Sequence, residues 1–249
     1  MTLLKAENVT KSFGGFQALK GASLSVNTGE IVGLIGPNGA GKSTFFNCLV
    51  GDMTPSSGKI LFSQEEVSLK SAEYHAKLGI GRTFQLPATF EELTLLENVM
   101  VGAFLRHPHV KDARQKAMEV LELTGMGEQI NLKAKTLGTP GRKRLEIARV
   151  LATEPKMMLL DEALAGLTPV EVQSAITLVK KIHQTGITLV IVEHIMEVII
   201  HLTQRVLVLN QGEVIATGAP KEVVNDPLVI QAYLGASYAR TAALGAKPA

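Results

Sequence analysis

The sequence predicts an α/β fold with a mostly parallel sheet, an antiparallel β layer near the N-terminus and a small inserted helical subdomain. Short apolar runs typical of buried strands occupy residues 31–35, 157–160 and 187–192. Between such runs lie stretches with apolar residues on one helical face, as at 169–183. Because strands separated by helices are joined by right-handed crossovers, we expect neighbouring strands to run parallel.

The chain length limits the number of domains, and the net charge limits the classes of partner that the protein can bind. The chain has 249 residues, enough for one large α/β domain with a small insertion. A net charge of +2 gives no electrostatic footprint for nucleic acid. Aromatic residues make up 4% of the chain and Trp is absent, so few side chains can stack on bases. The composition therefore argues against nucleic acid as a partner.

The single cysteine and the distribution of apolar residues indicate the compartment. Cys48 cannot form an internal disulfide, and its apolar neighbours favour a packed thiol in a reducing compartment. Residues 1–7 lack the basic start and apolar stretch of a signal peptide, and no run of about eighteen apolar residues occurs. We expect a protein that is cytosolic, or peripheral to a membrane through another chain.

Residues 36–44 are the motif around which the rest of the chain is organised. They read Gly36-Pro37-Asn38-Gly39-Ala40-Gly41-Lys42-Ser43-Thr44 and match G-x-x-x-x-G-K-[ST] at every fixed position. A predicted strand at 31–35 and a predicted helix at 43–50 flank the motif, as a phosphate-binding loop requires. The glycines let backbone N–H groups point at an anion, Lys42 adds a charge for the β- and γ-phosphates, and Ser43 offers a hydroxyl to Mg²⁺. The motif predicts a P-loop NTPase core.

The other elements follow from local patterns. Residues 3–30 alternate apolar stretches with glycine turns, which predicts the antiparallel layer. Further strands are expected at 59–62 and 80–85, a helical region at 94–136, a helix at 142–153 and a hairpin at 206–216. Thr139 and Pro140 fit the N-cap and first residue of the helix at 142–153. Thr168 and Glu171 fit a capping box that opens the helix at 169–183.

Polar residues follow several predicted strands where they end. Gln85 ends the strand at 80–85, Asp161 and Glu162 follow the strand at 157–160, and His194 follows the strand that ends at 192. Because ligands gather at the carboxyl ends of parallel strands, we expect these residues to act with the phosphate-binding loop. Hydrolysis of a γ-phosphate needs Mg²⁺, a group that positions water and a sensor of the terminal phosphate. We assign Asp161 to Mg²⁺, Glu162 to the attacking water, Gln85 to the metal and water, and His194 to the γ-phosphate.

Phe13 is open to two interpretations. An exposed aromatic ring can stack on a purine, whereas a phenylalanine in a strand is commonly part of the core. The sequence alone does not favour either.

At these residues the chain resembles the ATP-binding subunits of ABC transporters up to about Gly235. The phosphate-binding loop, Gln85, the Asp161–Glu162 pair, residues 165–168 in place of the D-loop and His194 follow the family's order. The resemblance implies that ATP and Mg²⁺ are bound and that Phe13 stacks on adenine. It implies one ATP-binding domain at 1–235 with a helical subdomain at about 90–155, followed by a flexible tail at 236–249.

The same resemblance implies partners and a location. ATP-binding subunits of this family dimerise head to tail with a second ATP-binding subunit, bind transmembrane permease subunits and serve a solute-binding protein indirectly. The expected location is the cytoplasmic face of the plasma membrane. Residues 82–85, 93–99, 145–149 and 232–235 are similar to one ATPase of the branched-chain (hydrophobic) amino-acid importer. Urea and amide importers have similar ATPases and stay as an alternative.

One segment departs from the family. Where the usual signature reads Leu-Ser-Gly-Gly-Gln, this chain has Leu137-Gly138-Thr139-Pro140-Gly141. A hydroxyl is missing at Gly138 and Pro140 lacks a backbone N–H, although Arg142 and Lys143 are candidates to replace part of the lost phosphate contact. The departure motivates a second hypothesis, a nucleotide-binding regulatory module with little turnover. A third, an ATPase of translation or DNA repair, is disfavoured by the single P-loop and the lack of basic surface.

Overall fold

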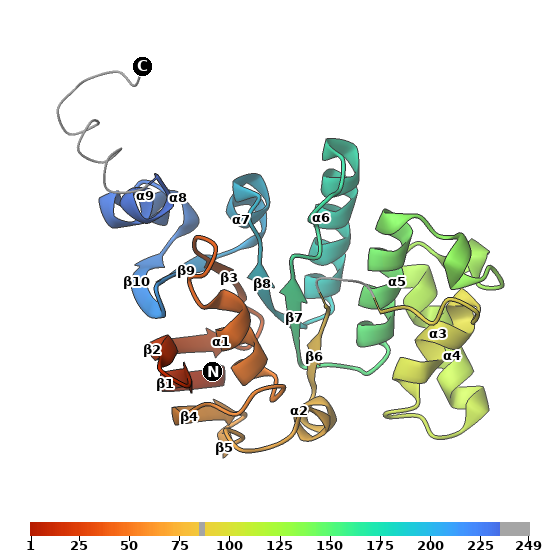
Figure 1. Cartoon of the computed structure of the whole chain (residues 1–249). Coiled ribbons are helices and arrows are strands. Elements are labelled where there is room, and N and C mark those ends of the chain that lie inside the picture. The colour runs from red at the N-terminus through yellow and green to blue at the C-terminus, as the bar shows by residue number, and fades with distance from the viewer. Residues whose placement is uncertain (85–87, 235–249) are drawn as a thin grey trace. The chain divides into compact units, whose positions relative to one another are not determined.

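The structure is a computed structural model that describes residues 1–84 and 88–234 (Figure 1). The chain divides into two compact units. The first comprises Met1–Lys70 together with the chain from Ile199 onwards, and the second comprises Ser71–Val198.

The first unit contains an antiparallel sheet in which β1 pairs with both β2 and β4, and β4 pairs with β5. Its strands are β1 (Thr2–Phe13), β2 (Phe16–Asn27), β4 (Ser57–Phe62) and β5 (Glu65–Glu66). Buried and exposed residues alternate along much of β2, as expected for a strand with one face on a core. Gly14 has a φ of 56° in the turn that joins β1 to β2.

The same unit holds the strand that leads into the phosphate-binding loop. All residues of β3 (Ile31–Ile35) are buried, and β3 pairs in parallel with β9 (Arg205–Asn210), which forms a hairpin with β10 (Glu213–Gly218). The helices here are α1 (Lys42–Leu49), α8 (Pro220–Val223) and α9 (Pro227–Leu234). Phe45, Phe46 and Leu49 of α1 are fully buried, so apolar packing fixes the helix that follows the loop.

The second unit contains three parallel strands. β7 (Met157–Asp161) pairs with β6 (Ile80–Arg82) on one side and with β8 (Thr188–Val192) on the other. β7 and β8 are wholly buried and almost entirely apolar, as expected for central parallel strands. α2 (Ala72–Leu78) precedes β6 and α6 (Pro169–Gln184) connects β7 to β8, while α7 (Met196–Leu202) runs from this unit into the first.

Three helices of the second unit pack together in the part coloured yellow to green in Figure 1. They are α3 (Leu95–Ala103), α4 (Val110–Leu123) and α5 (Thr139–Leu151), with short 3-10 turns at Gly127–Gln129 and Ala134–Thr136. α3 contacts both α4 and α5. At Gly102 any Cβ would overlap the Arg149 carbonyl oxygen, so a glycine is needed for α3 and α5 to approach closely.

The fold class expected from the sequence is confirmed, with two local corrections. The structure has the antiparallel N-terminal layer, parallel strands and the helical region. However, β6 ends at Arg82 rather than at Gln85, because the Phe84 N–H bonds to the Glu146 side chain instead of continuing a strand ladder. The N-cap of α5 is Gly138 rather than Thr139, which is already helical. Gln85 and the predicted tail at 236–249 lie outside the described residues.

Candidate functional site

The phosphate-binding loop joins β3 to α1 and has backbone conformations that require glycine. Gly36, Gly39 and Gly41 have φ values of 152°, 77° and 102°. A Cβ at Gly36 would overlap the Leu209 carbonyl oxygen, and one at Gly41 would lie 2.7 Å from the Ala18 carbonyl oxygen. The loop therefore packs closely against neighbouring backbone, and only glycine fits at these two positions.

Lys42 closes this loop from the first turn of α1. Its Nζ donates to the carbonyl oxygens of Gly36 at 2.7 Å and Pro37 at 3.0 Å, and the residue is 7% exposed. Asn38, Gly39 and Ser43 are exposed. The positive charge thus lies inside the curl of the loop while the Ser43 hydroxyl faces solvent, an arrangement suited to an anion that brings a metal ion with it.

Phe13 at the end of β1 is exposed rather than part of the core. Its ring is 47% exposed, and Lys11 Nζ lies 5.3 Å from the ring centroid. Phe16 opposes Phe13 across the hairpin and is 66% exposed. An exposed ring of this kind is open to stacking, which favours the first of the two interpretations of Phe13. Phe16 was not singled out from the sequence, because a strand pattern alone does not predict which aromatic rings face solvent.

Tyr233 of α9 contacts the start of the loop. Burial raises the pKa of its phenol, and a hydrogen bond from the Gly36 backbone opposes that rise. No local sequence pattern predicts this contact, since the two residues lie almost two hundred positions apart.

In the second unit, Asp161 lies at the end of β7 and is 7% exposed. Its Oδ2 accepts from Arg82 Nη2 at 3.0 Å, and its N–H donates to Thr83 Oγ1 at 3.1 Å. A buried carboxylate needs a cation or donors, and Arg82 on the neighbouring strand supplies both. Arg82 is a residue that sequence reasoning missed, because the strand pairing that brings it to Asp161 joins positions 79 apart.

Glu162 and His194, which the sequence assigned to water and to the γ-phosphate, are in direct contact. His194 Nε2 lies 2.7 Å from Glu162 Oε1, so with Glu162 ionised the imidazole N–H donates to the carboxylate. Glu162 has a left-handed backbone with φ of 48°, and its N–H donates to the Val192 carbonyl at 2.9 Å. The end of β8 therefore fixes Glu162 and carries the residue that its side chain meets.

Gln85 lies outside the described residues, but its flanks are bound to α5. Before it, the Phe84 N–H donates to Glu146 Oε1 at 3.0 Å, and the Arg82 guanidinium lies 4.9 Å from the Phe84 ring centroid. After it, Arg149 donates to the Ala88 carbonyl. Burial raises the pKa of Glu146 and lowers that of Arg149, which lie one turn apart on α5. One face of α5 thus anchors the chain on both sides of Gln85.

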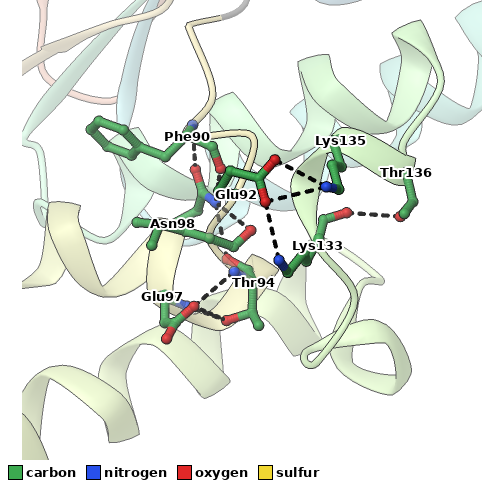
Figure 2. Close-up of polar contacts among 9 residues, drawn as sticks. Phe90, Glu92, Thr94, Glu97, Asn98, Lys133, Lys135 and Thr136 are labelled. Carbon is green, nitrogen blue, oxygen red and sulfur yellow. Dashed lines mark hydrogen bonds and ion pairs between the residues drawn. The ribbon is translucent and has the colours of Figure 1, made fainter.

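The chain beyond Ala88 is fixed by the start of α3 (Figure 2). Asn98 is fully buried and bonds both the N–H and the carbonyl of Phe90 at 2.9 Å. Thr94 and Glu97 form a capping box, and Glu92 bonds Lys133 and Lys135. The Phe90 ring lies 4.6 Å from the Arg149 guanidinium. These contacts hold an otherwise irregular segment in one conformation.

The departing signature begins α5 without a side-chain cap. Gly138 is the N-cap and no side chain bonds the first N–H groups, whereas α3 and α6 both open with capping boxes. Arg142 bonds Glu91 at 2.8 Å, and Lys143 donates to the carbonyls of Glu162 and Ala165. The two cations expected to replace the missing phosphate contact are therefore engaged within this chain.

Among the described residues, no group of three or more His, Cys, Asp or Glu side chains could hold a metal ion by itself. Nor does that part of the chain contain a helix long and apolar enough to cross a bilayer.

The residues that surround these features match a known family. The family model described as ABC transporter matches residues 19–165, a stretch that contains the phosphate-binding loop, Asp161 and Glu162. This chain belongs to the ABC transporter family. It is an ATP-binding subunit whose ATP hydrolysis is coupled to transport. A second family model, described as Branched-chain amino acid ATP-binding cassette transporter, matches residues 213–239.

Curated relatives extend the likeness over nearly the whole chain. The high-affinity branched-chain amino acid transport ATP-binding protein LivG of Salmonella typhimurium is 38% identical, over 94% of this chain and 98% of its own length. BraF of Pseudomonas aeruginosa, described in the same words, is 35% identical over the same shares. The lipopolysaccharide export system ATP-binding protein LptB of Haemophilus influenzae is 36% identical, over 96% of this chain and 99% of its own.

Solved structures agree with the fold. The ADP conformation of MJ1267, an ATP-binding cassette of an ABC transporter, superposes with a TM-score of 0.86 at 33% identity, over 94% of this chain and 99% of that chain. A dimeric structure of the cassette MJ0796 bound to ADP and Pi superposes with a TM-score of 0.79 at 28% identity, over 88% of this chain and 99% of that one.

Proposed function

We propose that this chain is an ATPase of an importer for branched-chain or other hydrophobic amino acids. The observation that carries the proposal is the 38% identity to LivG along almost the full length of both chains. The match of residues 213–239 to the branched-chain amino acid cassette model adds independent support from the C-terminal part. The protein acts at the cytoplasmic face of the plasma membrane, where transmembrane permease subunits hold it. A solute-binding protein delivers the solute to those permease subunits.

In the first unit, residues 37–44 cradle the nucleotide phosphates. The exposed loop and the Lys42 ammonium provide backbone N–H donors and charge, and the ring of Phe13 stacks on adenine. The ordered loop supports this role, because donors fixed before binding cost little to organise.

Ser43, Asp161 and Gln85 hold Mg²⁺, directly or through water. When bound, the metal neutralises charge on the β- and γ-phosphates. The fit is chemical: a hydroxyl, a carboxylate and an amide oxygen are the ligands that Mg²⁺ prefers. Arg82 donates to the Asp161 carboxylate at 3.0 Å and orients it for this task.

Glu162 polarises the attacking water and accepts its proton, and His194 contacts the γ-phosphate. The 2.7 Å bond between them supports the role of Glu162, because the imidazole orients the carboxylate that must accept the proton. This pair also argues against a regulatory module with little turnover, which would not need an oriented base.

The second ATP-binding subunit of the importer is a different chain with an intact signature. In a head-to-tail dimer, the signature of each chain completes the nucleotide site on the phosphate-binding loop of the other. The segment at 137–141 therefore weakens the partner's site rather than this chain's own. The engagement of Arg142 and Lys143 within this chain supports that asymmetry, because neither is placed to restore the lost contact.

A different transported solute is the competing possibility. LptB, with 36% identity, has a lipopolysaccharide export role, so overall identity alone does not fix the solute. ATPases of urea or amide importers form a second alternative. The match at 213–239 favours branched-chain amino acids over both.

Solute-stimulated ATP hydrolysis in proteoliposomes tests the proposal. The chain is purified with its permeases and partner ATPase, and hydrolysis is measured with solute-binding protein loaded with leucine or with urea. We expect stimulation by leucine, and a loss of roughly 10²–10⁴-fold in turnover with retained ATP binding for Glu162→Gln. Stimulation by urea alone would reassign the solute, and normal turnover of Glu162→Gln would remove Glu162 as the base.

A further inference from the structure

Lys143 is a buried cation on α5 whose ammonium points at the segment that follows β7. It is 8% exposed, and its Nζ donates to the carbonyl oxygens of Glu162 at 3.0 Å and Ala165 at 2.7 Å. Burial lowers the pKa of this ammonium, while the charges of Glu193, Glu146 and Glu162 oppose that effect. A cation is thus held in a poorly solvated place where it serves two backbone acceptors.

Glu193 holds the same segment from the end of β8. It is 1% exposed, and its Oε1 accepts from the Leu164 N–H at 2.8 Å. The charges of Lys143 and Glu193 attract each other. Residues 162–165 are therefore bound by an acceptor from one element and a donor from another, and these two side chains partly compensate each other's buried charge.

The contacts of Val192 and Lys143 fix the backbone of Glu162, and this sets the direction of its side chain. Glu162 adopts a left-handed conformation, φ 48°, which is unfavourable for a residue other than glycine. Its N–H is held by the Val192 carbonyl and its own carbonyl by Lys143. With both peptide groups fixed, the side chain leaves the backbone in the direction of His194, 2.7 Å away.

A purely architectural role would not need an ammonium at this position. An apolar side chain would fill the same space without burying a cation, but it would leave the Glu162 and Ala165 carbonyls without this donor. The acceptors are also specific, since one is the carbonyl of the residue proposed as the base.

We propose that Lys143 is a positioning residue for ATP hydrolysis, fixing the backbone of Glu162 so that its carboxylate meets His194. The inference rests on the proposed role of Glu162 as the base. It makes α5, the helix that starts with the departing signature, a direct determinant of turnover in this chain's own site.

Kinetics of the assembled transporter test the inference. Lys143→Met keeps the length and apolar stem of the side chain but removes the donor. We expect kcat to fall about ten- to hundredfold while the KM for ATP changes by less than about threefold, since the phosphate-binding loop is untouched. Lys143→Arg, which restores charged donors, should recover most of the loss.

Two controls separate this inference from the function on which it rests. Arg144→Met removes the neighbouring cation of α5, which donates to Ser174, and should leave kcat unchanged. Glu162→Gln should abolish turnover. If Lys143→Met has wild-type kcat while Glu162→Gln is inactive, Lys143 is not a positioning residue and the proposed function stands. If both turn over normally, the role of Glu162 itself is wrong.

Stability is checked on each variant, because two buried carbonyls lose a donor in Lys143→Met. Should that variant unfold below the assay temperature, Lys143→Gln replaces it with a shorter, neutral donor and an expected loss in kcat of about three- to tenfold. A wild-type kcat for Lys143→Gln, or a fall in kcat matched by an equal fall in affinity for ATP, overturns the inference.

Discussion

The phosphate-binding loop and the segment from Asp161 to Ala165 are organised in opposite ways. The loop is one contiguous stretch whose shape comes from glycine backbone, with Lys42 bonded to carbonyls five and six residues before it. The second segment takes its shape from side chains on other elements, namely Arg82, Lys143, Glu193 and His194. The loop has no room for a Cβ at Gly36 or Gly41, whereas the shape of the second segment depends on which distant side chains contact it.

The largest effect is expected from adding one carbon to the loop. Gly36→Ala should destabilise the protein by more than about 3 kcal/mol, because its Cβ overlaps the Leu209 carbonyl and its φ of 152° disfavours any side chain. Urea denaturation measures the change. Gly39→Ala is the matched control, since no atom lies within 4 Å of its Cβ and only its φ of 77° is unfavourable. That change should cost about 1–2 kcal/mol. Equal costs at the two positions would show that backbone crowding does not shape the loop.

The second prediction concerns buried charge in the other segment. Burial raises the pKa of Glu193 from 4.5 to about 7, while Leu164 and Lys143 oppose the rise and Glu162 adds to it. The pKa of the Glu193 carboxyl is near 4.5 in the unfolded chain and about 7 in the folded protein, so the folded state binds the proton more tightly. The resulting stabilisation is complete below about pH 4.5 and is lost as the pH rises through about 7.

Glu193→Gln removes this titration and should flatten the corresponding part of the pH profile. The wild-type free energy of unfolding, relative to that of the variant, should fall by at most about 3 kcal/mol between pH 4.5 and 8. Denaturation of both proteins at a series of pH values gives the difference, in which the other titrating groups largely cancel. A difference that does not vary with pH would mean that Glu193 stays ionised in the folded protein.

The smallest effect is expected at helix starts. Thr168 and Glu171 form the capping box predicted for α6, so Thr168→Ala should cost about 1 kcal/mol. Thr139→Ala at the start of α5 should change stability by less than about 0.5 kcal/mol, because Thr139 is exposed and caps nothing. Thermal unfolding of the pair compares them. A larger cost at Thr139 would reveal a cap that the structure does not contain.

The sequence by itself determined whatever is encoded within a few neighbouring residues. The phosphate-binding loop, the strand before it, the capping box of α6 and the fold class all follow from local spacing, and the structure contains each of them. Local patterns succeed here because glycine φ values and helix caps depend on adjacent backbone. The N-cap of α5 was misplaced by one residue, because Thr139 fits the cap chemically but is already helical.

Tertiary structure alone decided which long side chains serve the site. From the sequence, Lys143 was a candidate to contact the nucleotide phosphate in the partner's site. In the structure its ammonium donates to the carbonyls of Glu162 and Ala165. The sequence predicted a role for Asp161 but not for Arg82, which bonds to it in the structure. The sequence also left open whether the Phe13 ring is buried, and in the structure the ring is exposed. The reason is physical: a buried charge is stable only beside partners of suitable geometry. Those partners are set by strand pairing and helix packing between residues far apart in the chain.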